Sequence, residues 1–137
     1  MNKKITASLD EIEQVVRYLD ANVPPNAIIF LRGDLAAGKT TLVQAIAKAR
    51  GIEGDATSPT FSLQHYYGND LYHYDLYRIS NEEFMELGLL EEFEQDGWHM
   101  IEWGSQSLEN MLRDFGYDIV IVQITTTNMG RNYTILG

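Results

Sequence analysis

One segment combines glycine, lysine and threonine at the spacing of a phosphate-binding loop. It runs from Gly33 to Thr40, has the sequence GDLAAGKT, and matches the pattern G-x-x-x-x-G-K-[ST] at every fixed position. The glycines allow a tight turn close to a phosphate, while the loop amides and the N-terminus of the following helix attract an anion. Lys39 adds a cation that can reach the terminal phosphates, and Thr40 adds a hydroxyl that can bind Mg²⁺. The segment therefore predicts a site for a nucleotide and its magnesium ion.

A candidate metal-binding acid lies in a second segment. Nucleotide sites of this class need a carboxylate at the end of a neighbouring strand to hold the metal and its water. Glu102 closes a short apolar strand, so we predict that it holds Mg²⁺ together with Thr40. The alternative interpretation is a surface glutamate in an acidic region. Asp34, within the loop itself, is a rival ligand.

A third segment, residues 73–78, carries an imidazole, a carboxylate, a phenol and a guanidinium. Strand alternation places His73, Asp75 and Tyr77 on one face and leaves the residues between them free to pack into a core. Asp75 could orient or deprotonate water during a hydrolysis, and Arg78 could neutralise charge that develops on a phosphate. A polar strand face with satisfied hydrogen bonds is the other interpretation.

Weaker features accompany these segments. Hydroxyls in residues 58–61, Ser-Pro-Thr-Phe, could sense a γ-phosphate or its metal, although such a sequence is more often a plain turn. Trp103 could stack on a base or a partner, or could belong to the core. His65 and His99 have no metal-ligand spacing with other candidates, and we assign them no role. Residues 8–10 and the last hairpin could border a bound base.

Hydrophobic spacing and turn residues predict the elements that position these groups. Ser8 and Glu11 have the spacing of a capping box and precede a helical pattern that ends at residues 22–25, Asn-Val-Pro-Pro. Residues 28–31 are apolar on both faces, as in a central strand, and residues 41–50 form the helix after the loop. The loop therefore lies between a buried strand and a helix, which is the context that the motif requires.

The rest of the chain predicts two hairpins, a further strand and two helices. The expected pieces are hairpins of 61–66 with 71–77 and of 117–125 with 131–136, a strand at 98–103, and helices at 105–113 and at 81–87, the latter capped by Asn81. This order predicts one α/β domain over residues 1–137, similar to P-loop NTPases. We expect a mixed, mostly parallel central sheet flanked by helices.

The composition restricts the classes of function. The chain has 137 residues, 10 basic against 20 acidic, with a formal net charge of −10 and no cysteine. Disulfides and a thiol nucleophile are excluded, apolar runs are too short to span a membrane, and we expect a cytoplasmic protein. The acidic balance argues against direct coating of nucleic acid.

The acidic residues are unevenly distributed. Residues 79–112 contain no Lys or Arg and hold nine acids: Glu82, Glu83, Glu86, Glu91, Glu92, Glu94, Asp96, Glu102 and Glu109. Such a run is either a solvated face or a docking surface for a basic partner.

Taken together, the motifs resemble those of one family. The loop 33–41, then residues 58–61, then 73–78, then Glu102 and Trp103 follow the order and approximate spacing of the bacterial TsaE (YjeE) ATPases. These proteins act in forming threonylcarbamoyladenosine in tRNA. The chain departs from the family at Ala36, where the family usually has glycine, and a methyl group there restricts positive φ.

The resemblance implies roles for individual residues and two cofactors, ATP and Mg²⁺. Catalysis is implied for Asp75, Lys39 and Thr41, and metal binding for Thr40 and Glu102. The implied nucleotide-binding residues are Gly33, Leu35, Ala36, Ala37, Gly38, Lys39, Thr40, Thr41 and Trp103.

The resemblance also implies action with two partner proteins, TsaD and TsaB. TsaD would perform the carbamoyl transfer, and ATP hydrolysis by this chain, weak alone, would support turnover of their complex. We expect docking through the acidic residues 82–96 and contact with tRNA only through those proteins.

Two other functions remain open. One is a P-loop kinase of a small molecule, although such kinases usually close an arginine-bearing lid and no arginine lies between Arg78 and Arg113. The other is a nucleotide-binding switch or scaffold without useful turnover.

Overall fold

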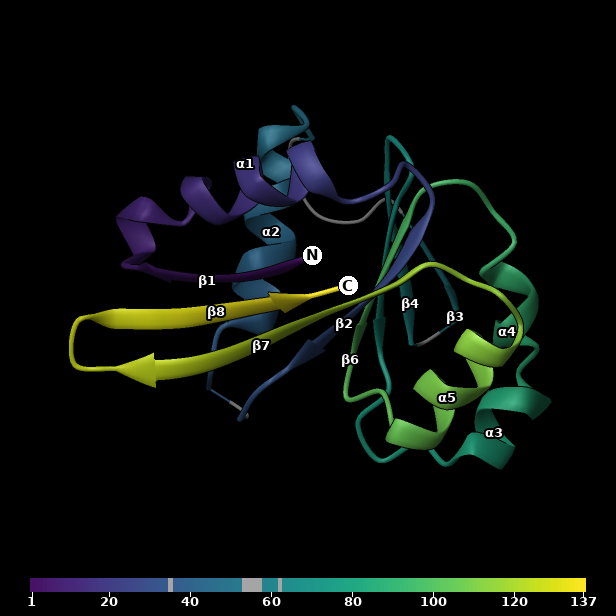
Figure 1. Ribbon diagram of the computed structural model, residues 1–137. Helices are drawn as coiled ribbons and strands as arrows, with labels where there is room; N and C mark the ends of the chain where they lie inside the picture. The colour runs from purple at the N-terminus through teal and green to yellow at the C-terminus, as the bar shows by residue number, and fades with distance from the viewer. Residues whose placement is uncertain (35, 53–57, 62) are drawn as a thin grey trace.

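The molecule is a central β-sheet with helices on both faces (Figure 1). The computed structural model describes residues 1–34, 36–52, 58–61 and 63–137. Their strands form one eight-stranded sheet in the order β1-β8-β7-β2-β6-β5-β4-β3. The bounds are β1 Asn2–Ala7, β2 Ala27–Arg32, β3 Ser58–Phe61, β4 Gln64–Gly68, β5 Leu71–Asp75, β6 Trp98–Glu102, β7 Ile119–Thr127 and β8 Gly130–Leu136.

The centre of the sheet is parallel and both of its sides are antiparallel. Strands β7, β2, β6 and β5 pair in parallel, whereas β1, β8 and β7 on one side and β5, β4 and β3 on the other pair antiparallel. The predicted α/β fold with a mixed sheet is confirmed. Parallel pairing is confined to the four central strands and does not dominate, because tight turns join β4 to β5 and β7 to β8 and force antiparallel pairing there.

Strand β2 occupies the centre because it is apolar on both faces. Ile29 and Leu31 face a core shared with the first two helices, while Ile28 and Phe30 face a second core on the other side of the sheet. All four side chains are fully buried. The strand that leads into the phosphate loop is therefore held rigidly from both faces, as the sequence predicted.

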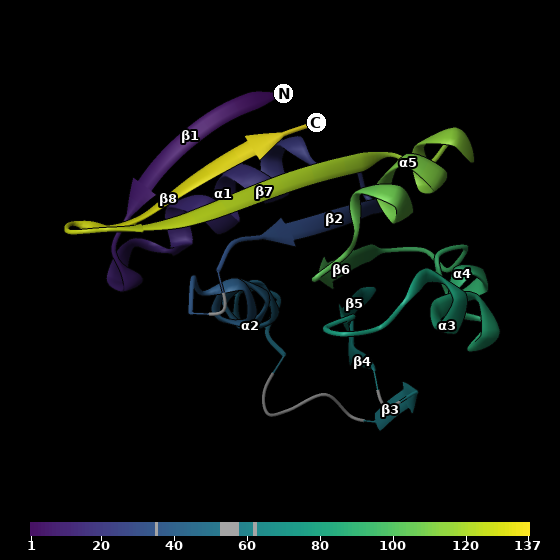
Figure 2. The same cartoon turned by 90° about the horizontal axis from the view of Figure 1, so that it is seen from below.

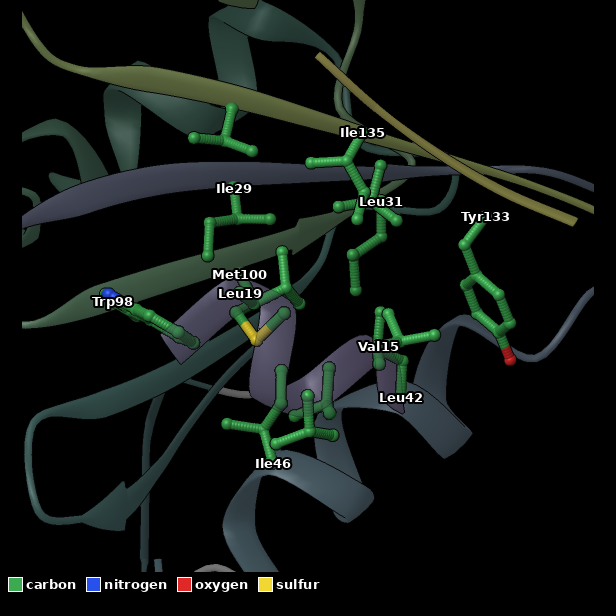
Figure 3. Packing of buried hydrophobic residues seen from close by; sticks show 14 of the residues in the cluster. Val15, Leu19, Ile29, Leu31, Leu42, Ile46, Trp98, Met100, Tyr133 and Ile135 are labelled. Carbon is green, nitrogen blue, oxygen red and sulfur yellow. The ribbon is translucent and has the colours of Figure 1, made fainter. Parts of the chain in front are cut away.

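The helices divide between the two faces of the sheet (Figures 1 and 2). Helices α1 (Glu13–Asn22) and α2 (Lys39–Ala49) cover one face. The other face is covered by α3 (Asn81–Glu86), α4 (Leu89–Glu92) and α5 (Gln106–Asp114). Figure 3 shows the first core, in which side chains of the two long helices meet those of the sheet: Val15, Leu19, Leu42 and Ile46 against Ile29, Leu31, Met100 and Ile135.

The local signals predicted several boundaries correctly. Ser8 and Glu11 form the expected capping box, in which the backbone N–H of Ser8 donates to Glu11 Oε1 at 3.0 Å. The β4–β5 hairpin turns at Asn69 and Asp70, both with positive φ, which is the geometry that matches the twist of two-residue hairpins. No helix in the described part of the chain is long and apolar enough to cross a membrane.

Three local expectations are corrected. The cap of α3 is Ser80, whose hydroxyl accepts the Glu83 N–H at 3.1 Å, because it precedes the first helical residue, Asn81. Residues 58–61 form the edge strand β3 where a turn was the more common expectation. Strand β1 was not predicted, since its pairing with β8, at the other end of the chain, creates it.

Candidate active site

The phosphate loop joins the carboxyl end of β2 to α2, and two glycines shape it. A Cβ on Gly33 would lie 2.5 Å from the carbonyl oxygen of Ile124 in β7. Gly38, the N-cap of α2, has a φ of 100°, and a Cβ there would lie 2.6 Å from Nη1 of Arg131. Only glycine fits these two positions without displacing a neighbour. Leu35, one of the predicted binding residues, lies outside the described residues.

Lys39 is buried at the start of α2, and its ammonium group is held by its own loop. Nζ donates to the carbonyl oxygens of Gly33 at 2.7 Å and Asp34 at 3.2 Å, and lies 3.7 Å from the ring centre of Trp103. Burial lowers the pKa of Lys39, whereas the charges of nearby carboxylates, Glu102 first, act in the opposite direction. The result is a partly desolvated cation at the predicted phosphate position.

Glu102 ends β6 beside the loop and gathers two donors. Thr40 Oγ1 donates to Glu102 Oε2 at 2.7 Å although 62 residues separate them. His73 Nε2 lies 2.5 Å from the same oxygen, and it is the donor because an ionised carboxylate only accepts. Burial acts to raise the pKa of Glu102, but the hydrogen bonds from His73 and Thr40 hold it below its usual value. Glu102 is therefore a carboxylate at neutral pH.

Asp75 ends β5 directly opposite Glu102 in the β5–β6 pairing. Its side chain is exposed, and Oδ1 accepts the backbone N–H of Tyr77 at 3.0 Å. Thr41 lies in the first turn of α2 and is partly exposed. Arg78 lies with its guanidinium 5.1 Å from the ring centre of Tyr77. The structure therefore brings Asp75 to the loop edge of the sheet, while Arg78 stacks on a neighbouring aromatic ring.

Trp103 covers the lysine. It follows β6 directly and has a φ of 62°, a left-handed conformation that is uncommon for a bulky residue. Its ring is close to the Lys39 ammonium on one side and 5.0 Å from the ring of Tyr77. This tryptophan thus belongs to the roof of the loop and not to either core.

Two residues near the loop were not identified from the sequence. Arg131 of β8 reaches across the sheet to Gly38, which places a guanidinium at the N-terminus of α2. His73 was expected only to share a face with Asp75, and its contact with Glu102 was not predicted. The sequence indicated the last hairpin as a possible border of a bound base, but nothing in its spacing singled out Arg131. The side chains of residues 58–61, expected to sense phosphate, lie outside the described part of the chain.

Cavities lie on two sides of the loop. One of 220 Å³ is lined by Lys39, Trp103, Gly33 and neighbouring residues. A second, of 370 Å³, lies between the loop and the end of β7, where Ala36 and Ala37 form part of its wall. The loop is thus accessible from both sides.

The donor set fits a nucleotide with magnesium. Mg²⁺ usually takes one or two protein oxygens together with substrate phosphates and water. Among the described residues no group of three or more His, Cys, Asp or Glu side chains could hold a metal ion alone. The adjacent oxygens of Thr40 and Glu102 are instead suited to a metal that a phosphate completes.

Comparison with known proteins agrees with the family resemblance of the motifs. A family model described as "Threonylcarbamoyl adenosine biosynthesis protein TsaE" matches residues 6–133. The chain belongs to the TsaE family. A Bacillus subtilis protein named tRNA threonylcarbamoyladenosine biosynthesis protein TsaE is 33% identical over 141 residues, covering 96% of this chain and 88% of that protein. A TsaE protein of Haemophilus influenzae is 36% identical over 118 residues, covering 77% and 74%.

A solved structure shares the fold. The crystal structure of Bacillus subtilis YdiB superposes with a TM-score of 0.62 and 25% identity, covering 100% of this chain and 88% of that one. The resemblance to the TsaE family and the α/β fold class are therefore both confirmed.

Proposed function

We propose that this TsaE-family chain binds Mg²⁺-ATP at residues 33–41 and hydrolyses it slowly, in support of threonylcarbamoyladenosine formation in tRNA. The observation that carries the proposal is the meeting of the Lys39 cation, the Thr40 hydroxyl and the Glu102 carboxylate at one end of the sheet. The names of the B. subtilis and H. influenzae relatives support the tRNA-modification role.

Nucleotide binding uses groups that already surround the loop. The loop amides and the N-terminus of α2 hold the phosphates, and Lys39 turns from the carbonyls of Gly33 and Asp34 to the β- and γ-phosphates. Arg131, next to Gly38, supplies a second positive charge to the nucleotide. Trp103 covers the lysine and limits access of water to it.

Hydrolysis uses the two acids at the ends of β5 and β6. Thr40 and Glu102 hold the Mg²⁺ ion, which neutralises charge on the phosphate oxygens. Asp75 is exposed beside Glu102, and it orients the attacking water and accepts its proton. The water oxygen bonds to the γ-phosphorus while the bond to the leaving oxygen of ADP breaks. Thr41, in the first turn of α2, is the third proposed catalytic residue, together with Asp75 and Lys39.

The chain acts with TsaD and TsaB and does not itself transfer the carbamoyl group. The acidic residues 82–96 support docking to a basic protein surface, while a net charge of −10 disfavours direct contact with tRNA. The same acidic stretch forms α3 and α4, which carry no arginine and therefore do not support the lid of a small-molecule kinase.

ATP hydrolysis by the wild type, measured with and without the TsaD–TsaB complex, tests this proposal. We expect slow turnover alone and an altered rate with the partners. Asp75→Asn should lower turnover by about 100-fold or more and leave the Kd for ATP within about threefold, because its role is in proton transfer. Asp114→Asn, an exposed acid at the end of α5, is the matched control.

Three results would contradict parts of the proposal. A wild type that does not bind ATP removes the function altogether. A rate that TsaD and TsaB do not change removes their role, and full turnover in Asp75→Asn removes the role of that carboxylate.

A further inference from the structure

A groove lies at the edge of the parallel strands opposite the phosphate loop. Two adjoining cavities of 310 Å³ and 370 Å³ form it, and Glu94 and Tyr117 border both. The amino ends of β2, β6 and β7 line the first cavity, through Ala27, Gly97 and Asp118. We call this surface the amino-end groove. It is separated from the loop by the length of β2, six residues or about 20 Å.

The outer part of the groove presents apolar side chains to solvent. Phe115, just beyond the end of α5, is 58% exposed and lines the second cavity together with Leu90 and Tyr117. Phe93 lies beneath, with its ring 6.4 Å from that of Tyr117. An aromatic side chain this exposed at the lip of a cavity offers contact area to another molecule.

Every ionised side chain that lines the groove is acidic. Among the described residues that line the two cavities there is no Lys or Arg, and the acids are Glu91, Glu94, Asp96 and Asp118. Burial raises the pKa of the Tyr117 phenol, and the nearby negative charge of Glu94 raises it further. The groove therefore combines apolar contact area with uncompensated negative charge.

The histidine in the groove wall supplies no positive charge. His99 Nε2 donates to the carbonyl oxygen of Gln95 at 2.8 Å, and the hydroxyl of Tyr74 donates to Nδ1 at 2.7 Å. Burial lowers the pKa of His99, so that the ring is neutral at pH 7. Both ring nitrogens therefore form hydrogen bonds within the protein, and the neutral ring does not offset the negative charge of the groove.

We propose that the amino-end groove docks a basic segment of a partner protein. An apolar side chain of that segment lies between Phe115 and Tyr117, and its Lys or Arg side chains lie beside Glu91 and Glu94. Charge complementarity selects this occupant, because an acidic rim repels nucleic acid and attracts a cationic peptide.

The inference rests on the proposed action with TsaD and TsaB. It narrows the predicted docking surface from residues 82–96 to the part in and after α4, and it adds the end of α5. The glutamates of α3 are outside the groove and become a natural control.

Titration calorimetry with the purified TsaD–TsaB complex tests the groove. The double reversal Glu91→Lys with Glu94→Lys should weaken binding at least tenfold at low salt and flatten its salt dependence. Phe115→Ser should weaken it about tenfold at both low and high salt, since its contact is apolar. The matched control, Glu82→Lys with Glu86→Lys on α3, changes the charge equally and should stay within about threefold. Groove variants that bind like the wild type, or a control that loses as much, would overturn the inference.

A second measurement separates this inference from the proposed function. NMR titration of the labelled chain with acetyl-Lys-Lys-Phe-Lys-amide should shift amides of residues 90–97 and 115–118, and acetyl-Glu-Glu-Phe-Glu-amide should not. Scattered shifts, or none at millimolar peptide, would overturn the groove. A wild type that binds this peptide in the groove but not TsaD–TsaB would leave the groove standing and refute the proposed partners. ATP affinity, measured on each variant, should equal that of the wild type.

Discussion

His73 and His99 lie on the neighbouring central strands β5 and β6, and their surroundings are opposite in character. His73 donates to the carboxylate of Glu102 beside the phosphate loop. His99 accepts from the hydroxyl of Tyr74 within the second core. The Tyr74 hydroxyl in turn accepts from Gln64 Nε2, which also donates to the carboxylate of Glu92. The first cluster thus contains charges at its centre, and the second is neutral there.

Strand alternation and depth explain the difference. Residues 73 and 74 point to opposite faces of β5, and so do residues 99 and 102 of β6. At the end of the strand, hydrogen bonds from Thr40 and His73 keep the Glu102 carboxylate ionised despite its burial. In the interior, burial lowers the pKa of His99 and raises that of Tyr74, so both stay uncharged. The same residue types therefore form a ligand-ready cluster on one face of β5 and β6 and a structural cluster on the opposite face of the same two strands.

The largest expected effect is on the ligand-ready side. Lys39→Ala removes the cation that would contact the phosphates, and we expect nucleotide affinity to fall about 100-fold or more, since charge-assisted hydrogen bonds are the strong ones. Fluorescent-nucleotide titration measures this. Lys48→Ala, in the last turn of the same helix, is the control and should bind as the wild type does. Equal loss in both variants would show that the loop lysine is not special.

Glu102→Gln keeps the size of the side chain and removes its charge. The Mg²⁺-dependent part of ATP affinity should fall about 10- to 100-fold, because a metal loses an anionic ligand. Affinity measured in EDTA should change far less. Asp34→Asn, the rival ligand from the loop, should leave the Mg²⁺ dependence intact. If Glu102→Gln weakens binding equally with and without Mg²⁺, Glu102 is not a metal ligand.

Tyr74→Phe tests the structural cluster. Removing the hydroxyl leaves His99 Nδ1 and Gln64 Nε2 without this partner, and we expect a loss of about 1–3 kcal/mol in the free energy of unfolding. Urea denaturation gives the value. Nucleotide affinity should not change. Tyr72→Phe, which keeps the ring stacked on His99, should cost less than about 0.5 kcal/mol. A variant of Tyr74 that is stable but binds nucleotide poorly would join the two clusters and break the comparison.

The smallest effect is a pH dependence of stability. Because burial lowers the folded pKa of His99 below the usual 6.5, the unfolded chain binds a proton there that the folded chain does not. Stability therefore falls as pH drops below about 6.5, by at most ~1.4 kcal/mol per unit. The pKa of Glu102 is lowered in the folded chain. The stability that its ionised carboxylate provides therefore persists at pH 5 and is lost only as the pH falls below the usual glutamate pKa of 4.5. Urea unfolding at pH 7, 6 and 5 should show a smaller slope in His99→Asn; an unchanged slope would contradict this assignment.

Short-range patterns in the sequence predicted the loop and its position between a buried strand and a helix. They also predicted that Glu102 would meet Thr40, because the carboxyl ends of neighbouring parallel strands share one edge of a sheet. The loop depends on residues within two adjacent elements, so local spacing and hydrophobicity are sufficient to find it. The meeting of Glu102 with Thr40, 62 residues away, depended in addition on the predicted sheet.

The remaining parts of the site depend on strand order, which local patterns do not contain. Arg131 reaches Gly38 only because β8 pairs with β7, which pairs with β2. His73 meets Glu102 because β5 lies beside β6 in a particular register. The requirement for glycine at position 33 likewise comes partly from β7, whose Ile124 carbonyl leaves no room for a Cβ.

The hydrogen bonds of Lys39 to its own loop have a consequence for nucleotide exchange. The carbonyls of Gly33 and Asp34 act as an internal counterpart that the γ-phosphate must displace. The net free energy of ATP binding is then the difference between the contacts of Lys39 with the phosphates and its contacts with these carbonyls, and this lowers the affinity. When the γ-phosphate is gone, the lysine can return to these carbonyls. We therefore expect ADP to dissociate faster than ATP, because the loop carbonyls compete with the remaining phosphates for Lys39.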